Sequence, residues 1–196
     1  MEERRRQKLL SVAQKRQMGF IVVLEDIHDP HNAAAILRTC DAFGVQTVYF
    51  VFQEEKPYNP KRIGKASSSS ANKWLDITIF NSTSSCLAAL NKDGYTIMAT
   101  DLSPVAQNIY DAVLSPGNIA LVVGNEHRGV SAEMLKKSDM VLAIPMVGMV
   151  QSLNVSVAAA LCIAEIIRKR SIQTSFLYPE GRTQELVSRW VEGKKS

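Results

Sequence analysis

The sequence predicts an α/β protein with a mostly parallel sheet. Short apolar stretches with the character of strands alternate with helical stretches along the chain, and the first strand–helix–strand unit has the order that builds parallel sheets. A long helix expected over residues 155–170 is apolar on nearly every side, so it needs a core or a partner surface to cover it. Together these observations favour helices layered against a sheet.

The first strand–helix–strand unit is defined by its apolar runs and its helix ends. Phe20–Leu24 is apolar at every position, as in a buried strand. After a polar loop, Asn32 has the side chain of a helix cap, and Gly44 is a typical helix end. The expected elements are a strand at 20–24, a helix at 33–43 capped by Asn32, and a strand at 47–52.

The second half repeats the alternation after a polar loop that contains the serine run Ser67–Ser70. Short apolar runs again predict the strands, and Ser131 is expected to cap a short helix that ends at Lys137. Residues 181–192 have the spacing of a short amphipathic helix. The remaining expected elements are strands at 77–80, 95–100, 119–123 and 141–144 and helices at 83–91, 131–137 and 155–170.

Length and composition exclude several classes of protein. The 196 residues suit one domain with a full hydrophobic core. No apolar run approaches the ~20 residues of a membrane span, and the charged N-terminal end lacks the apolar stretch of a signal peptide. Cys40, Cys86 and Cys162 are scattered, so neither a disulfide framework nor a zinc site is expected. A cytoplasmic protein without membrane association is predicted.

The net charge of +4 lies entirely in residues 1–18, where six cationic side chains oppose two acidic ones. A helix that binds a polyanion has this composition, but so does a solvated helix end. A second basic cluster, residues 168–170, ends the long apolar helix, where cations also suit the helix dipole. On the polyanion-binding interpretation, the side chains expected to make the contacts are Arg4, Arg5, Arg6, Lys8 and Arg168.

The most informative stretch of the chain is residues 144–161. Gln151, Ser152 and Asn154 form a polar island in a run that is otherwise apolar. A strand, a loop and a buried helix do not need these side chains, whereas a site that holds a polar ligand beside a core helix does. The stretch therefore predicts a binding site.

Two other segments carry weaker signals. Asn32 is followed by three alanines and then Arg38, and a helical arginine can reach back toward the N-terminal end of its helix. The simpler interpretation is a cap and a solvent-facing arginine. Gly124-Asn-Glu126-x-x-Gly129 follows a strand; Gly124 would let a ligand approach the backbone, and Glu126 would accept hydrogen bonds or steady a cation. A plain strand-to-helix turn explains it equally well.

The positions of these segments support a shared site. In open α/β sheets, ligands bind at the carboxyl ends of the strands. Three such ends are followed by polar loops, at residues 25–32, 124–129 and 148–154. We therefore expect the three loops to converge.

Other chemistries are disfavoured. The dinucleotide-binding and Walker patterns are absent, as is the Gly-x-Ser-x-Gly elbow of serine hydrolases. His28 and His31 have a spacing compatible with a metal, but no further ligand cluster accompanies them, so no metal is expected. Trp74 is expected to pack rather than to stack on a base.

Taken together, Asn32-x5-Arg38, Gly124-Asn-Glu126-x-x-Gly129 and Ile-Pro-Met-x-Gly-x-x-x-Ser-Leu-Asn-Val-Ser (residues 144–156) resemble the three motifs of the SPOUT-class RNA 2′-O-methyltransferases. The order and spacing match over residues 20–170, and the third motif is most similar to the TrmH branch, the tRNA guanosine 2′-O-methyltransferases. The resemblance implies a SPOUT fold with helices on both faces of the sheet and a deep C-terminal trefoil knot. It divides the chain into a basic N-terminal helix (1–18), a methyltransferase domain (19–170) and a short C-terminal tail or helix (171–196).

The resemblance also implies the ligands and the site. S-adenosylmethionine is the expected cofactor, and the functional unit is expected to be a homodimer with sites near the subunit interface. Family positions for the cofactor fall on Thr100, Gly124, Ile144, Met146 and Leu153. The family's essential arginine falls on Arg38, supported by Asn32, Glu126, Ser152 and Asn154.

The expected reaction is in-line transfer of a methyl group to a ribose 2′-oxygen, in which positioning supplies much of the acceleration. Arg38 as a literal base is unfavourable, because lowering a guanidinium pKa to near 7 costs roughly 7 kcal/mol. Our hypothesis is that Arg38 stays charged, grips a phosphate and stabilises the developing alkoxide, while a phosphate or water takes the proton.

The expected substrate is tRNA. Only 18 residues precede the first strand, which leaves no room for the separate RNA-binding domain of many rRNA-modifying relatives. In the TrmH branch the target is the D-loop guanosine at tRNA nucleotide 18. The alternatives are another tRNA or rRNA nucleotide, or an RNA-binding module that keeps the fold without catalysis.

Overall fold

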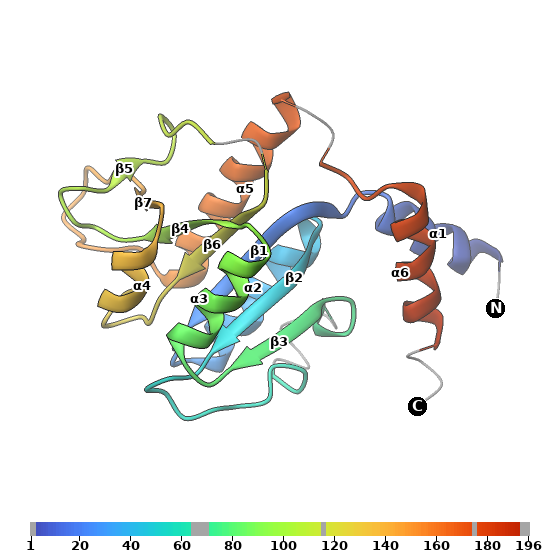
Figure 1. The fold of residues 1–196 in the computed structure, drawn as a ribbon, viewed down its shortest axis with the longest axis horizontal. Helices are drawn as coiled ribbons and strands as arrows, with labels where there is room; N and C mark the ends of the chain where they lie inside the picture. The colour runs from blue at the N-terminus through green and yellow to red at the C-terminus, as the bar shows by residue number, and fades with distance from the viewer. Residues whose placement is uncertain (1–2, 64–70, 115–116, 174–175, 193–196) are drawn as a thin grey trace.

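A computed structural model describes residues 3–63, 71–114, 117–173 and 176–192; the serine run 67–70 lies outside these ranges. Its centre is a seven-stranded sheet with the order β3-β2-β1-β6-β4-β7-β5, in which every neighbouring pair is parallel (Figure 1). The strands are β1 Gln17–Glu25, β2 Val45–Val51, β3 Asp76–Phe80, β4 Thr96–Thr100, β5 Gln107–Asn108, β6 Ile119–Val123 and β7 Met140–Ala143. The predicted α/β class and parallel sheet are confirmed.

Helices cover both faces of the sheet. They are α1 Glu3–Ala13, α2 Pro30–Ala42, α3 Thr83–Lys92, α4 Ala132–Lys137, α5 Val155–Gln173 and α6 Glu180–Glu192, with a 3-10 turn η1 at Ala71–Lys73. α2 and α5 pack together on one face, and α3 and α4 pack together on the other. None of the helices in the described ranges combines the length and the hydropathy that a membrane span needs.

Strand β1 explains why its sequence is apolar at every position. Phe20, Val22 and Leu24 point into the core formed with α2 and α5, whereas Ile21 and Val23 point into the core formed with α3 and α4. Successive side chains of a strand alternate between its faces, so a central parallel strand between two helical layers has no polar face. This run is what fixes β1 at the middle of the sheet.

The two terminal helices form a separate small cluster. Leu9 and Ala13 of α1 pack against Leu186, Val187 and Trp190 of α6, and the pair lies at one end of the molecule (Figure 1). Trp74 joins this cluster, with its ring 5.5 Å from that of Trp190, so the predicted packing role of Trp74 is confirmed.

Arg16 connects this terminal pair to the main domain. Its side chain is only 1% exposed and pairs with Asp41 at 2.5 Å, at the C-terminal end of α2. It also donates to the carbonyl of Val45 at 3.4 Å, and its guanidinium lies 5.3 Å from the Trp190 ring centroid. Of the six cations in residues 1–18, this one is structural.

One predicted helix cap is wrong. The side chain of Asp29, not Asn32, caps α2 by accepting a hydrogen bond from the His31 amide at 2.8 Å, and Pro30 occupies the first turn. Proline is favoured there because its missing N–H and fixed φ suit a helix start. Asn32 therefore lies inside the helix, with its side chain available for another contact. The Ser131 cap of α4 is confirmed.

The sequence also missed two short elements, η1 and the two-residue strand β5. Neither is long enough to produce a periodic pattern, and β5 exists because it pairs with β7 at the edge of the sheet. The predicted 155–170 helix is real but runs on to Gln173, across the expected boundary at residue 170.

Candidate active site

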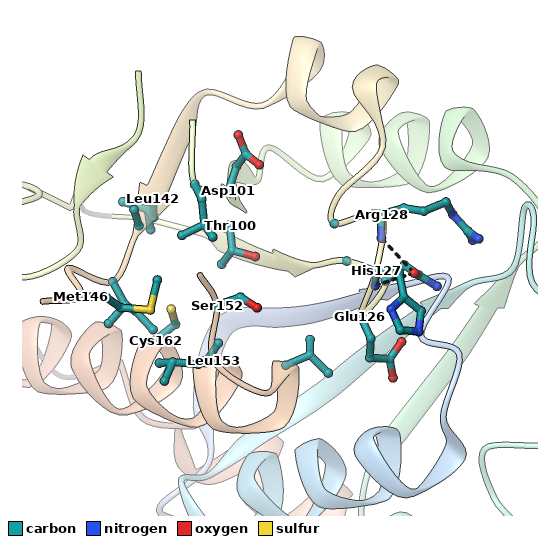
Figure 2. A pocket seen from close by; sticks show the side chains of 18 residues that line it. Thr100, Asp101, Glu126, His127, Arg128, Leu142, Met146, Ser152, Leu153 and Cys162 are labelled. Carbon is teal, nitrogen blue, oxygen red and sulfur yellow. Dashed lines mark hydrogen bonds between the residues drawn. The ribbon is translucent and has the colours of Figure 1, made fainter. Parts of the chain in front are cut away.

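A cavity of about 320 Å³ opens at the carboxyl ends of β4, β6 and β7 (Figure 2). The start of α5 forms one wall, through Val155, Ala158 and Cys162. All five residues expected to bind a cofactor line this cavity, namely Thr100, Gly124, Ile144, Met146 and Leu153, and so do Glu126 and Ser152. The volume falls within the range of small-molecule sites, roughly 300–1,000 Å³.

Glu126 holds two of the predicted loops together. Its carboxylate accepts hydrogen bonds from the amides of His28 and Asp29, at 2.8 and 3.1 Å, and from the Asn32 side chain at 2.8 Å. Burial alone would raise the pKa of Glu126, but these hydrogen bonds outweigh it and hold the pKa below its ordinary value. The group is therefore an ionised anchor and a poor proton acceptor at neutral pH.

Asn154 brings in the third loop. Its side-chain amide donates to the Asn32 oxygen at 3.0 Å, while its own oxygen accepts from the Ser156 amide at 2.8 Å. Asn154 therefore both caps α5 and fastens the 148–154 loop to α2. The expected convergence of the three loops is confirmed by this chain of contacts, which runs from Glu126 through Asn32 to Asn154.

The tight turn after β6 explains why position 124 is a glycine. The amides and carbonyls of Asn125 and Gly129 bond to each other at 3.0 and 2.9 Å, which closes the loop on itself. A Cβ on Gly124 would lie 2.2 Å from the Gly129 carbonyl carbon. Glycine is thus required here for contact with its own loop, and not only for the approach of a ligand as the sequence suggested.

The match to a known family covers this whole arrangement. The model of the SpoU rRNA methylase family matches residues 19–164, which include the sheet, the cavity and all three loops. The chain belongs to the SpoU methylase family. The predicted membership is confirmed, and residues of the second and third motifs line the cavity.

Relatives within the family are similar over most of their length. The chain is 35% identical to a protein of Aquifex aeolicus named tRNA (guanosine(18)-2′-O)-methyltransferase, over 96% of this chain and 89% of the relative. A relative of the same name from Thermus thermophilus is 38% identical over 86% and 84%. The crystal structure of the A. aeolicus TrmH/SpoU tRNA modifying enzyme superposes with a TM-score of 0.88 and 34% identity, covering 98% of this chain and 97% of that one.

Of the five predicted catalytic residues, Glu126 and Ser152 line the cavity of this SpoU methylase, whereas Asn32, Asn154 and Arg38 do not. Arg38 is exposed on α2, six residues after Asn32 and so about 9 Å further along the helix axis. The residues that line the cavity come from other elements. The chain thus places Glu126 and Ser152 at the cavity, joins Asn32 to Glu126 and Asn154 to Asn32 by hydrogen bonds, and has Arg38 further along α2. The catalytic roles of these residues stay predictions.

The two basic clusters differ in the structure. Arg4, Arg5, Arg6 and Lys8 are exposed on α1. Arg168, in contrast, forms two hydrogen bonds of 2.8 Å with Glu165 one turn earlier in α5. Its neighbours have structural partners as well, since Lys169 and Arg170 both donate to backbone carbonyls.

Arg170 is the most buried residue of the 168–170 cluster. Its guanidinium lies 3.8 Å from the Phe176 ring centroid and donates to Met18 and Gly117 carbonyls. Burial lowers the pKa of Arg170 to about 10, so it remains charged at neutral pH. The cluster at 168–170 is therefore largely engaged within the fold.

Sequence reasoning missed several cavity residues, among them Asp101, His127, Arg128 and Cys162. Asp101 and Arg128 belong to the loops after β4 and β6, so their place at strand ends was the available signal. Cys162 is a wall residue, and burial raises the pKa of its thiol to about 12, which makes it unreactive. In the described ranges no group of three or more His, Cys, Asp or Glu side chains is arranged to hold a metal.

Proposed function

We propose that this chain transfers a methyl group from S-adenosylmethionine to the ribose 2′-hydroxyl of the D-loop guanosine at tRNA nucleotide 18. The observation that carries the proposal is the similarity to enzymes named for this reaction, which extends over 96% of the chain and 89% of the first of them. The terminal helices α1 and α6 fall within the superposed region, which covers 98% of the chain.

The cavity suits S-adenosylmethionine. Its lining combines apolar side chains such as Leu142, Leu153 and Met146 with polar groups such as Ser152, which suits a ligand that joins a methionine chain to a polar nucleoside. Loops 124–129 and 144–154 offer backbone groups beside that lining. The residues that would hold the cofactor are Thr100, Gly124, Ile144, Met146 and Leu153; when bound, the cofactor supplies an electrophilic methyl group on a sulfonium.

The protein's own groups position and polarise the ribose. Asn32 is held by hydrogen bonds to Asn154 and to Glu126, which lines the cavity, and we propose that it helps to place the ribose. Ser152 adds a hydroxyl on the opposite loop. We propose that Arg38 remains charged, grips an RNA phosphate and stabilises the developing alkoxide, while a phosphate or water takes the proton. If Arg38→Lys kept near-normal turnover, this bidentate role would be wrong.

We also propose that the active form is a homodimer. Val147, Met149, Val150, Val157 and Leu161, in the 144–154 loop and on α5, are large apolar side chains that a single chain leaves exposed. Contiguous exposed apolar surface of this kind is typical of a protein interface. Sedimentation should give a dimer for the wild type and a monomer for Val157→Asp; a monomeric wild type would contradict the proposal.

RNA binding is assigned to the terminal helices. Arg4, Arg5, Arg6 and Lys8 on α1 are proposed to contact phosphates, with Arg168 as a further contact. The expected division into a basic helix (1–18), a methyltransferase domain (19–170) and a C-terminal tail (171–196) stays a proposal, although α1 ends at Ala13, β1 begins at Gln17 and α5 runs on to Gln173. We propose that α1 and α6 act as one RNA-binding unit because they pack together. A tRNA-modifying enzyme of this kind is expected to work in the cytoplasm.

The trefoil knot expected from the family is a further proposal. The proposal follows from membership of the SpoU methylase family. If the chain is knotted, pulling its two ends should extend it to less than its full contour length, which is about 3.4 Å per residue. Full extension in a single-molecule experiment would contradict the knot.

The central experiment is methyl incorporation into unmodified tRNA, with and without a substitution of guanosine 18. Incorporation that disappears with the substitution supports the proposal. Incorporation that persists would assign the activity to another nucleotide, for which one relevant relative is the solved structure titled for 2-OH methylation of C/U34 on tRNA, with 28% identity and a TM-score of 0.63. Incorporation into rRNA alone would favour an rRNA target, and none into any RNA would favour a non-catalytic RNA-binding module.

A further inference from the structure

Glu55 lies at a junction that the three motifs do not account for. It belongs to the loop after β2, and its side chain is only 18% exposed. One carboxylate oxygen is 2.8 Å from His28 Nδ1; the other accepts hydrogen bonds from Arg128 at 2.9 Å and from Asn125 at 3.2 Å. A single carboxylate thus joins the loop before α2, the loop after β6 and its own loop.

The contacts of Glu55 complement those of Glu126. Glu126 accepts from the main-chain amide of His28, whereas Glu55 binds the side chain of the same residue. His28 is therefore held from both sides, four residues before Asn32. Two carboxylates from different loops thus fix the segment that leads to Asn32, the hydrogen-bond partner of the cavity residue Glu126. Only one of the two carboxylates lies in a family motif.

We propose that Glu55 is a positioning residue for methyl transfer, fixing the 28–32 segment against the 124–129 loop so that Asn32 meets the ribose at the correct distance. The inference depends on the proposed function. It differs from a merely stabilising role because the partners His28 and Arg128 are 63% and 49% exposed, and ion pairs with such solvated groups contribute little to stability. A displacement of about 1 Å at a reacting group, in contrast, can cost about 100-fold in rate.

The arm through His28 depends on pH. The hydrogen bond with Glu55, followed by its negative charge, raises the pKa of His28, and Glu126 and Asp29 add smaller effects in the same direction. Hydrogen bonds from His28 and Arg128 lower the pKa of Glu55. The His127 ring is the other titratable neighbour, with its centroid 6.5 Å from that of His28.

The sign of the effect follows from the raised pKa. The ion pair is complete below the ordinary His28 value of 6.5 and is lost as the pH rises through the raised value. Methyl transfer limited by this contact should therefore decline on the alkaline side of that pKa.

The test compares Glu55→Ala and Glu55→Gln with the control Glu54→Ala, which removes a neighbouring acidic group of the same loop. Glu54 contacts Arg128 at 3.3 Å and is largely exposed. In single-turnover assays, Glu55→Ala should lower the methyl-transfer rate by about 10-fold to 100-fold, with a smaller change in KM and an unchanged melting temperature. Glu54→Ala should retain wild-type rates. Glu55→Gln keeps an acceptor for Arg128 and should move the alkaline decline to lower pH.

A second measurement does not require activity. NMR titration of the His28 ring in the ligand-free protein should give a raised pKa in the wild type and in Glu54→Ala, and a lower one in Glu55→Gln. An unchanged His28 pKa in Glu55→Gln, or equal rates for Glu55→Ala and Glu54→Ala, would overturn the inference. If wild-type protein methylates no RNA, the proposed function fails independently of the titration.

Discussion

The cavity end of the sheet and the pair of terminal helices use charge in opposite ways. Around the cavity, Glu126 and Glu55 accept hydrogen bonds from donors in neighbouring loops, so both carboxylates are already paired within the protein. Glu126 accepts from backbone amides, whereas Glu55 binds side chains. On α1 the cations Arg4, Arg5 and Lys8 are exposed on the surface. The difference separates a preorganised site from a surface suited to a large polyanion.

Within the terminal region one charge behaves like those of the cavity. Arg16 is buried and fixes α1 and α6 to the end of α2. The comparison therefore predicts that neighbouring cations of the same sequence segment have very different effects when they are removed.

The largest expected effect on stability is that of Arg16→Ala. Arg16 is buried but Asp41 is 31% exposed, so losing this pair and the contact with the Trp190 ring should cost about 1–3 kcal/mol. Urea denaturation should show this loss. Arg5→Ala is the control, because substitution of an exposed side chain usually changes stability by less than about 0.5 kcal/mol. Equal midpoints for the two variants would mean that Arg16 does not anchor the terminal helices.

Glu126→Ala should mainly affect catalysis. It leaves the His28 and Asp29 amides and the Asn32 side chain without their acceptor, and the resulting displacement of Asn32 is expected to lower kcat by about 100-fold. Single-turnover methyl transfer would measure this. Glu133→Ala, on the exposed side of α4, should behave like the wild type; a similar loss there would point to a general effect of acidic residues.

The smallest and most selective effect is expected for the surface cations. Arg4 and Lys8 lie four residues apart on one face of α1, which points away from the face that Leu9 and Ala13 bury against α6. Replacing both by Gln should weaken tRNA binding and reduce the slope of log K against log salt by roughly 0.7–0.9 per lost phosphate contact. Filter binding over a range of salt concentrations measures it.

The comparison predicts that Arg168→Gln changes that slope less, because Arg168 already forms an ion pair with Glu165. A slope change as large as that of the α1 double variant would show that this pair opens to bind RNA.

Much of the architecture was accessible from the sequence because the signals were local and repeated. The apolar run of β1, the cap at Ser131 and the polar island at 151–154 each predicted a feature that the structure contains. The predictions that failed concerned features that depend on contacts between residues far apart in the sequence. Asn32 has the right side chain for a cap, but Asp29 followed by Pro30 is a stronger helix start, and the Asn32 amide is engaged with Glu126, 94 residues later.

The basic segments show the same limit. Arg16 and Arg170 look like members of solvent-exposed charge runs, yet each is buried against main-chain carbonyls contributed by remote parts of the chain. Glu55 belongs to none of the sequence motifs, because its contacts with His28 and Arg128 form only when three loops come together in the fold. A run of charged residues in the sequence therefore does not show which of its side chains are exposed to solvent and which are buried.

Asn154 makes the first turn of α5 and the ligand site thermodynamically linked. The side-chain oxygen of Asn154 caps the N-terminal end of α5, while the nitrogen of the same side chain donates to Asn32. Any ligand that favours the ordered arrangement of Asn32 must, by reciprocity, also favour the helical state of residues 155–158, and a partner that stabilises that turn must tighten ligand binding by the same factor. An interface formed along α5 would therefore act as an effector of the cavity without touching the ligand.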